Sequence, residues 1–280
     1  MKSNHITQTL LLSAITSLTL APMVQAAEAA AYTATSNINL VSQYRFRGID
    51  QTWGKPAVQG GADISMSNGF YVGGWASNVS GNSYPGGSIE LDYYGGYNGK
   101  INDDVSFTVG GYGYLYPGAN YKNAACPSAA FSTPCNQPAQ NFNTFEVNAG
   151  VSWKWLSYKL SVSTGDYFGA NQSTGYEKGT AGSMYHDVTV TYALSDDISL
   201  TGHLGHTNVK ARYAGSNASY SDYRLAINKT WPGGWSASTA FVGATNNRFF
   251  RPPSGGLSAA NAETRAVNRQ VLVVQIGRTF

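Results

Sequence analysis

Apolar and polar side chains alternate at every second residue through most of this chain, and this periodicity limits the folds open to it. In residues 145–154, for example, Phe145 and Val147 alternate with Glu146 and Asn148. Successive side chains of a β-strand point to opposite faces, so such a segment predicts a strand with one apolar and one polar face. About twelve segments follow the pattern, at residues 37–47, 58–66, 70–79, 89–98, 105–116, 145–154, 156–164, 185–194, 198–209, 223–231, 235–245 and 272–280.

The connections between these segments alternate in strict order between short and long. Asn68-Gly69 is a tight hairpin signal. The other short connections are Gly99–Asp104, the Trp155-Leu156 junction, Ser195–Asp197 and Pro232–Gly234. The long ones, rich in Gly, Pro and Asn, are Asp50–Lys55, Gly81–Gly87, Pro117–Asn141, Gly169–Ser183, Lys210–Ser221 and Asn247–Ala266. Short turns on one rim and long loops on the other are typical of outer-membrane barrels, and an even strand count puts both termini on the short-turn, periplasmic side.

A secreted, soluble β-sandwich is the main alternative fold. A sandwich would also contain short strands in which apolar and polar residues alternate. It does not require short loops at one end and long loops at the other, or aromatic residues near the strand ends. We expect those aromatic residues to form interfacial girdles: Trp53, Trp75, Tyr112, Tyr114, Tyr116, Trp153, Trp155, Tyr167, Tyr192, Trp231, Trp235, Phe249 and Phe250.

Hydropathy and composition agree with a barrel in a membrane. Only helices and closed barrels satisfy every backbone hydrogen bond in lipid, and no stretch beyond residue 27 has eighteen consecutive apolar residues. Charged residues make up 12% of the chain, well under the roughly 25% of ordinary soluble domains. We therefore predict an all-β fold, a single antiparallel transmembrane β-barrel of about twelve strands of the outer-membrane type.

The first residues of the chain have the order of parts of a secretory signal peptide. A weakly basic start with Lys2 leads into the apolar stretch Leu10–Leu20, followed by small residues up to a predicted cleavage site after Ala26. A transmembrane anchor is the alternative, but the apolar run is short and interrupted by Ser and Thr. We expect residues 1–26 to be the signal peptide and residues 27–280 to form the barrel.

The two cysteines, Cys126 and Cys135, lie close together in the third long connection. In an oxidising compartment such a pair favours a local disulfide, with two free thiols as the alternative. The spacing alone makes a poor metal site, because no histidine is near to complete it.

Three segments of the first third of the chain resemble a known family. They are residues 40–61 (LVSQYRFRGIDQTWGKPAVQGG), 69–78 (GFYVGGWASN) and 90–97 (ELDYYGGY). They look like the TorF family of proteobacterial porin-type proteins, and the resemblance continues more loosely to the C-terminal strand. It implies an outer-membrane location and a passive pore, and it names no substrate. The cysteine pair of the third long connection departs from the family pattern.

The last strand, residues 271–280, resembles the C-terminal signal read by the outer-membrane assembly machinery. Phe280 is its specific feature. Arg278 departs from the pattern, since that position is usually aromatic or apolar. Near the membrane interface an arginine can reach the lipid headgroups, so the match is weakened without being lost.

If the apolar face of each strand meets lipid, the opposite face lines the lumen. Polar lumens mark either a water-filled channel or a charge network that plugs a narrow barrel. Side chains can fill a barrel of roughly eight strands, and open porins have sixteen or more. A barrel of twelve strands lies between these sizes, so both a narrow channel and a plugged barrel remain possible. The pore-lining candidates are Arg45, Arg47, Asp63, Glu90, Asp92, Glu146, Lys154, Lys159, Asp187 and Arg224.

Arg45 and Arg47 are two residues apart, and we expect them on one face of one strand. One hypothesis makes them part of a basic constriction that passes small anionic solutes. The other pairs them with lumen carboxylates for stability, and the sequence slightly favours this pairing.

Other classes of function have less support. His203 and His206 are three residues apart on a predicted strand, so they face opposite sides and cannot share a metal ion. A lipase-type barrel enzyme needs a Ser and a His placed together, and the histidines lie in no Gly-x-Ser-x-Gly setting. The formal net charge of +3 is too small to indicate nucleic-acid binding.

The sequence therefore predicts an outer-membrane porin-like channel for passive diffusion of small solutes, with no enzymatic activity and no cofactor. The alternative is a non-conducting structural or adhesin barrel that presents extracellular loops. The expected partners are outer-membrane lipids, the outer-membrane assembly machinery and small solutes; the oligomeric state is left open.

Overall fold

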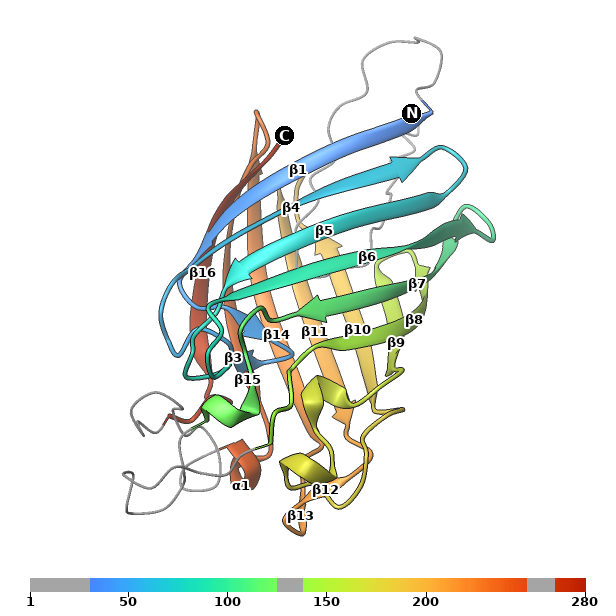
Figure 1. Ribbon diagram of the computed structural model, residues 1–280. Coiled ribbons are helices and arrows are strands. Elements are labelled where there is room, and N and C mark those ends of the chain that lie inside the picture. Colours follow the sequence, from blue (N-terminus) through green and yellow to red (C-terminus); the bar gives the residue numbers. More distant parts are fainter. Residues whose placement is uncertain (1–30, 125–137, 251–264) are drawn as a thin grey trace, which may run out of the picture.

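The computed structural model describes residues 31–124, 138–250 and 265–280. Over these residues the chain forms a closed barrel of twelve antiparallel strands (Figure 1). The predicted fold class and strand count are confirmed. The barrel strands are β1 (Tyr32–Val41), β4 (Ala57–Met66), β5 (Phe70–Asn78), β6 (Ile89–Lys100), β7 (Val105–Leu115), β8 (Thr144–Trp153), β9 (Leu156–Ser163), β10 (Met184–Ala193), β11 (Ile198–Asn208), β14 (Tyr220–Trp231), β15 (Trp235–Ala244) and β16 (Val271–Thr279).

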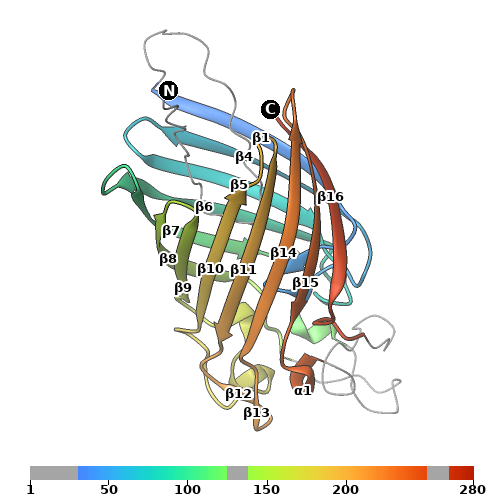
Figure 2. The ribbon, with the colours of Figure 1, turned by 180° about the vertical axis from the view of Figure 1, so that it is seen from behind.

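The strands follow one another around the barrel, and the first and last meet to close it (Figure 2). β1 pairs with β4 on one side, where Val41 lies opposite Ala57, and with β16 on the other. Beyond the last paired residue, Ser36 and Phe280 exchange two backbone hydrogen bonds of 3.2 and 2.8 Å. Closure leaves no exposed strand edge, which a barrel in lipid requires.

The order of short and long connections is confirmed. The short turns, such as the one at Asn68 and Gly69, all lie at one end of the barrel. The start of β1 at Tyr32 and the end of the last strand, next to Phe280, lie at the same end (Figure 1). Gly69 has φ +97°, a conformation that glycine adopts without strain. The six long loops gather at the other end, where they contain α1 (Asn247–Phe250), η1 (Tyr121–Asn123), η2 (Tyr167–Gly169), η3 (Gln172–Thr174), β12 (Arg212–Tyr213) and β13 (Ser216–Asn217).

Apolar side chains project outward from the barrel wall. Leu204, Leu225 and Leu272 are each more than 60% exposed. Along β14 the outward Leu225 and Ile227 alternate with residues that face the interior. A band of exposed leucine, valine and isoleucine around a closed barrel is the reverse of a soluble protein and matches a wall in contact with lipid.

Of the residues predicted to form aromatic girdles, only those at the short-turn end face outward. Trp153, Trp155, Tyr192, Trp231 and Trp235 are 45 to 60% exposed there. The girdle prediction is wrong for a second group, whose side chains face the barrel interior or pack among the loops: Trp53, Trp75, Tyr112, Tyr114, Tyr116, Tyr167, Phe249 and Phe250. The position of an aromatic residue near a strand end does not determine whether its side chain faces lipid or the barrel interior. On β7, Tyr112 and Tyr114 have the parity opposite to that of the outward-facing Leu115.

The first long loop folds into the barrel, which corrects the strand predicted at residues 37–47. β1 ends at Val41, and the chain then turns inward to form a small hairpin of β2 (Arg45–Phe46) and β3 (Ile49–Asp50). Tyr44 is only 8% exposed and packs inside the barrel instead of meeting lipid. The prediction that Arg45 and Arg47 share one face of one wall strand is therefore wrong. We call residues 44–53 the inner hairpin.

The tip of the inner hairpin packs against the barrel wall at β14 and β15. Arg47 and Gly48 both have positive φ, +47° and +77°. A Cβ atom at Gly48 would lie 2.7 Å from the carbonyl oxygen of Gly243 on β15 and from Cβ of Asp222 on β14. Arg47 at the same tip bonds Glu146 on β8, five strands from β1 in the barrel order, so the hairpin and its side chains extend across the lumen at the loop end.

Two predictions concern residues outside the described ranges. These are the signal peptide of residues 1–26 and the disulfide between Cys126 and Cys135. Within the described ranges, no helix has the length and hydropathy needed to span a membrane.

Candidate functional site

The inner hairpin is fixed to the barrel wall by a buried ion pair. The Arg47 guanidinium donates two hydrogen bonds to Glu146 on β8, of 2.9 and 2.7 Å, and a third of 3.1 Å to the hydroxyl of Tyr167. Its carbon Cζ lies 4.0 Å from the centre of the Tyr185 ring on β10, within range of a cation–π interaction. Both charged side chains are at least 94% buried, so neither is available to a passing solute.

A second cluster holds the base of the hairpin. Arg45 donates to the carbonyl of Val267 (2.8 Å) and forms an ion pair of 3.7 Å with Asp50. Asp50 also accepts a hydrogen bond of 3.0 Å from Nε of Arg265. Burial lowers the pKa of Arg45 to about 10, with Asp50 acting in the opposite direction, so this guanidinium stays charged at neutral pH. The hairpin is thus tied to the last long loop as well as to the wall.

On the β6–β7 side, tyrosine hydroxyls supply the hydrogen bonds of buried carboxylates. Tyr44 of the hairpin donates to Glu90 (3.2 Å), and Tyr112 donates to Asp92 (2.8 Å). Glu90 is fully buried and Asp92 is 7% exposed. Deeper in the barrel, Tyr94 donates to Asp63 (2.6 Å). No ion pair to Glu90, Asp92 or Asp63 is found among the described residues, and tyrosine hydroxyls are their hydrogen-bond partners here.

On the other side of the lumen, His203 bridges two aspartates. Its Nδ1 lies 3.2 Å from Asp187 and its Nε2 lies 3.0 Å from Asp222. Thr189 and Tyr185 also contact the ring, at 3.1 and 3.0 Å. Lys159 of β9 and Arg224 of β14 lie at positions whose side chains face the lumen, on the same part of the wall.

The structure places the ten pore-lining candidates in three locations. Asp63, Glu90, Asp92, Glu146, Lys159, Asp187 and Arg224 are on the inward face of wall strands. Arg45 and Arg47 are inside the barrel but on the inner hairpin. Lys154 is wrongly predicted: it lies in the short turn after β8, half exposed, 3.4 Å from Asp104. Its φ of +52° shows that the chain has already left the strand there.

The interior changes character toward the short-turn end. The inward positions there carry small polar side chains that stay partly exposed to solvent, among them Asn98, Asn148, Thr191, Thr201 and Asn228. Large aromatic and paired charged residues fill the loop end instead. The short-turn half of the lumen is thus accessible to solvent, and the inner hairpin occupies the loop end.

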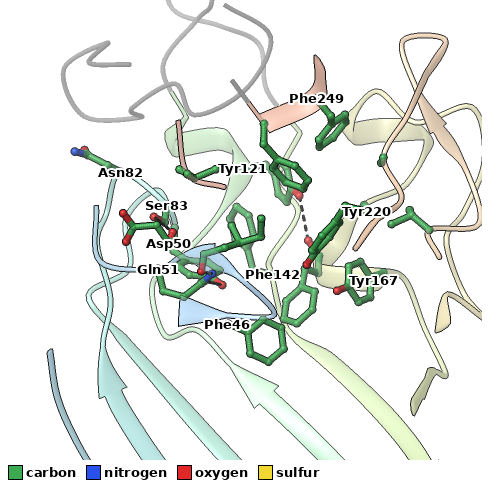
Figure 3. A pocket seen from close by; sticks show the side chains of 18 of the residues that line it. Phe46, Asp50, Gln51, Asn82, Ser83, Tyr121, Phe142, Tyr167, Tyr220 and Phe249 are labelled. Carbon is green, nitrogen blue, oxygen red and sulfur yellow. Dashed lines mark hydrogen bonds between the residues drawn. The ribbon is translucent and has the colours of Figure 1, made fainter. Parts of the chain in front are cut away.

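A cavity of about 300 Å³ lies beside the inner hairpin at the loop end (Figure 3). All six long loops contribute to its lining, and side chains from the hairpin and from several other segments surround it (Figure 3). Eleven of its twenty lining residues are aromatic: Phe46, Trp53, Tyr84, Tyr121, Phe142, Tyr167, Phe168, Tyr176, Tyr220, Phe249 and Phe250. Of the described residues in that lining, Asp50 is the one that carries a charge. We call this space the loop-end cavity.

Several residues of the loop-end cavity and of the His203 cluster were not predicted from the sequence. Tyr84, Tyr121, Phe142 and Tyr176 lie in loops, where no periodicity indicates a face. Asp222 and Tyr185 do lie on strands of correct parity, and the inward alternation of β10 and β14 was the signal that could have found them.

Two further features bear on the enzyme and metal hypotheses. On the outward face of the wall, Nδ1 of His206 lies 2.9 Å from Oγ of Ser221, a contact between strands that the sequence did not indicate. Among the described residues no carboxylate or amide is found on the other nitrogen of His206, as a catalytic triad would require. The same residues contain no group of three or more His, Cys, Asp or Glu that could hold a metal ion.

Comparison with known families places the chain in one of them. Residues 25–280 match the family described as "Bacterial protein of unknown function (Gcw_chp)", and the chain belongs to that family. No curated protein matches it.

Several solved structures resemble the barrel. One is described as "KdgM porin in complex with disordered oligogalacturonate", with a TM-score of 0.49 and 9% identity over 89% of this chain and 98% of that one. The NanC porin has a TM-score of 0.48 and 9% identity over 89% and 99% of the two chains. An outer membrane channel from Pseudomonas putida F1 has a TM-score of 0.43 and 11% identity over 91% and 100%.

Proposed function

We propose that this protein is an outer-membrane channel through which small solutes diffuse passively. The observation that carries the proposal is the contrast between the two faces of one closed wall. The outside is a band of exposed apolar side chains, and the inside is lined by polar residues that solvent reaches. A wall of this kind is stable in lipid and encloses water.

The location and orientation are part of the same proposal. The short turns and both chain ends would face the periplasm, and the long loops would lie outside the cell, as in other barrels with this order of connections. The resemblance of residues 40–97 to the TorF family and the terminal Phe280 support an outer-membrane location. The partners would be outer-membrane lipids, the assembly machinery that reads the last strand, and the solutes themselves.

The inner hairpin makes the channel narrow. Since Arg47 and Arg45 are held by Glu146 and Asp50, we do not propose a basic constriction that selects anions. Solutes would pass around the hairpin. Their path would lie between the wall at β6 and β7, where tyrosines bond carboxyl groups, and the wall that carries His203.

Swelling of proteoliposomes tests this proposal. The purified protein is reconstituted into liposomes and exposed to uncharged solutes of graded size. We expect the smallest polyols to enter and larger oligosaccharides to be excluded. Absence of entry by any solute, with the protein shown to be folded, would refute passive diffusion and leave the barrel assignment intact.

A second candidate function is a non-conducting barrel that presents its loops outside the cell. The buried ion pairs that fix the inner hairpin favour it, because a rigid plug across the lumen would stop flow. A protein of this kind would show no swelling as wild type, whereas a variant that lacks the hairpin would.

A further inference from the structure

We infer that the loop-end cavity binds an uncharged, ring-shaped solute that offers hydrogen-bond acceptors, an inference that rests on the proposed channel function. Its volume of about 300 Å³ is at the lower end of the range of small-molecule sites. It lies beside the inner hairpin, so a solute that enters from the loop end meets it before the narrow part of the lumen.

The lining sets the shape of the ligand. Rings provide most of the surface, and some already stack in parallel: Tyr121 and Phe142 have centroids 4.2 Å apart with planes at 11°. Tyr84 and Tyr116 stack similarly at 4.0 Å, with Tyr84 in the lining. Rigid aromatic walls give large contact areas with flat molecules at little entropic cost. A rigid ring with a broad apolar face, of a sugar or an aromatic group, suits such walls better than a flexible chain.

The charges of the site favour an uncharged ligand. Among the described residues that line the cavity, Asp50 is the one carboxylate, and Arg45 and Arg265 already pair with it. A charged solute would lose its hydration without gaining a partner, which weakens its binding. A cation attracted by the ring faces would also need a free carboxylate, and Asp50 is not free.

Trp53 adds an observation that is independent of the cavity shape. It lines the cavity at 5% exposure, and its indole Nε1 is buried with no hydrogen-bond partner among the described residues. Buried donors without partners are rare in folded proteins. Trp53 also has φ +56°, a strained conformation for a bulky residue and one that occurs preferentially at functional sites. A ligand oxygen that accepts from this N–H would satisfy the donor.

Isothermal titration of the full-length protein in detergent micelles tests the inference. The two probes are p-nitrophenyl β-D-glucopyranoside and p-nitrophenyl β-D-glucuronide, which share their rings and differ by one carboxylate. We expect saturable binding of the glucoside and binding of the glucuronide that is weaker by about tenfold or more. Equal affinity for both probes, or no binding of the glucoside, would overturn the inference.

Two variants locate the binding. Trp53→Phe keeps a ring and removes the N–H, so glucoside affinity should fall about tenfold. The matched control Trp155→Phe, at the exposed short-turn rim, should leave the affinity unchanged. If Trp53→Phe fails to fold, Phe142→Leu serves instead and should weaken binding by removing a stacked ring. Unchanged affinity in a folded cavity variant would contradict the site.

Conductance in planar bilayers separates this inference from the channel proposal. Ion current without glucoside binding would refute the binding site and keep the channel. Glucoside binding without any ion current would refute the channel and, with it, the role of the bound molecule as a passing solute.

Discussion

Arg47 and Glu146 form a two-pronged ion pair, with hydrogen bonds of 2.9 and 2.7 Å, across the interior of the barrel. The arginine comes from the inner hairpin and the glutamate from wall strand β8. The pair therefore holds a loop inside the lumen, and its two residues are 99 positions apart in the chain.

Breaking this pair should release the inner hairpin. In Glu146→Gln the buried guanidinium of Arg47 loses its counter-charge, a change that typically costs about 3–5 kcal/mol. We expect higher and noisier single-channel currents. The exposed pair of Lys154 and Asp104 provides the control, since Lys154→Gln should leave the current unchanged. Identical currents in wild type and Glu146→Gln would show that the pair does not set the width of the path.

The face of each wall residue predicts its tolerance to charge. Leu225 is 62% exposed on the outside of β14, near the middle of the strand. Leu225→Arg should lower the free energy of unfolding in lipid vesicles by about 2–4 kcal/mol. Ser238→Arg on the inward face of β15, opposite Asn228 and Gln275, should cost much less. Denaturant titration of both variants measures the difference, and equal costs would contradict the assigned faces.

The C-terminal residue closes the barrel. Phe280 exchanges two backbone hydrogen bonds with Ser36, and the Arg278 guanidinium lies 4.7 Å from its ring and 5.4 Å from that of Trp235. Deletion of Phe280 should sharply reduce the folded fraction, measured by heat-dependent mobility on denaturing gels. Arg278→Ala should have a small effect, because the backbone ladder with Trp235 and Ile38 is kept. A deletion variant that assembles at the wild-type yield would rule out this role.

The exposed tryptophans should report the membrane interface. Trp153, Trp155, Trp231 and Trp235 are each about 46% exposed at the short-turn rim, whereas Trp53 is buried in the lumen. With lipids brominated near the headgroups, we expect strong quenching of the rim tryptophans. In a variant that retains Trp53 alone, quenching should be weak. Strong quenching in that variant would place Trp53 against lipid.

The wall of the barrel could be predicted from the sequence because the physical constraint on it is local. Lipid outside and water inside force alternation along each strand, so Phe145 and Glu146 reveal their faces by parity alone. Turn residues such as Asn68 and Gly69 gave the connections for a similar reason, since they encode one backbone shape.

The inner hairpin could not be predicted, because its alternation continues that of β1. Tyr44 and Phe46 alternate with Arg45 and Arg47 just as wall residues do, yet the chain has left the wall after Val41. Only contacts distant in sequence, such as the one from Arg47 to Glu146, hold this segment inward. Gly48 after Arg47 was the local sign of a turn.

Single-channel conductance tests whether the inner hairpin narrows the channel. Residues 43–54 are replaced by a short Gly-Ser linker, which the pairing of Val41 with Ala57 allows without change to the barrel. The control replaces the exposed hairpin of β12 and β13 by the same linker. We predict small currents in wild type and control and a several-fold larger conductance in the first variant. Equal conductance in all three proteins, or no current in the variant that lacks the inner hairpin, would contradict the account.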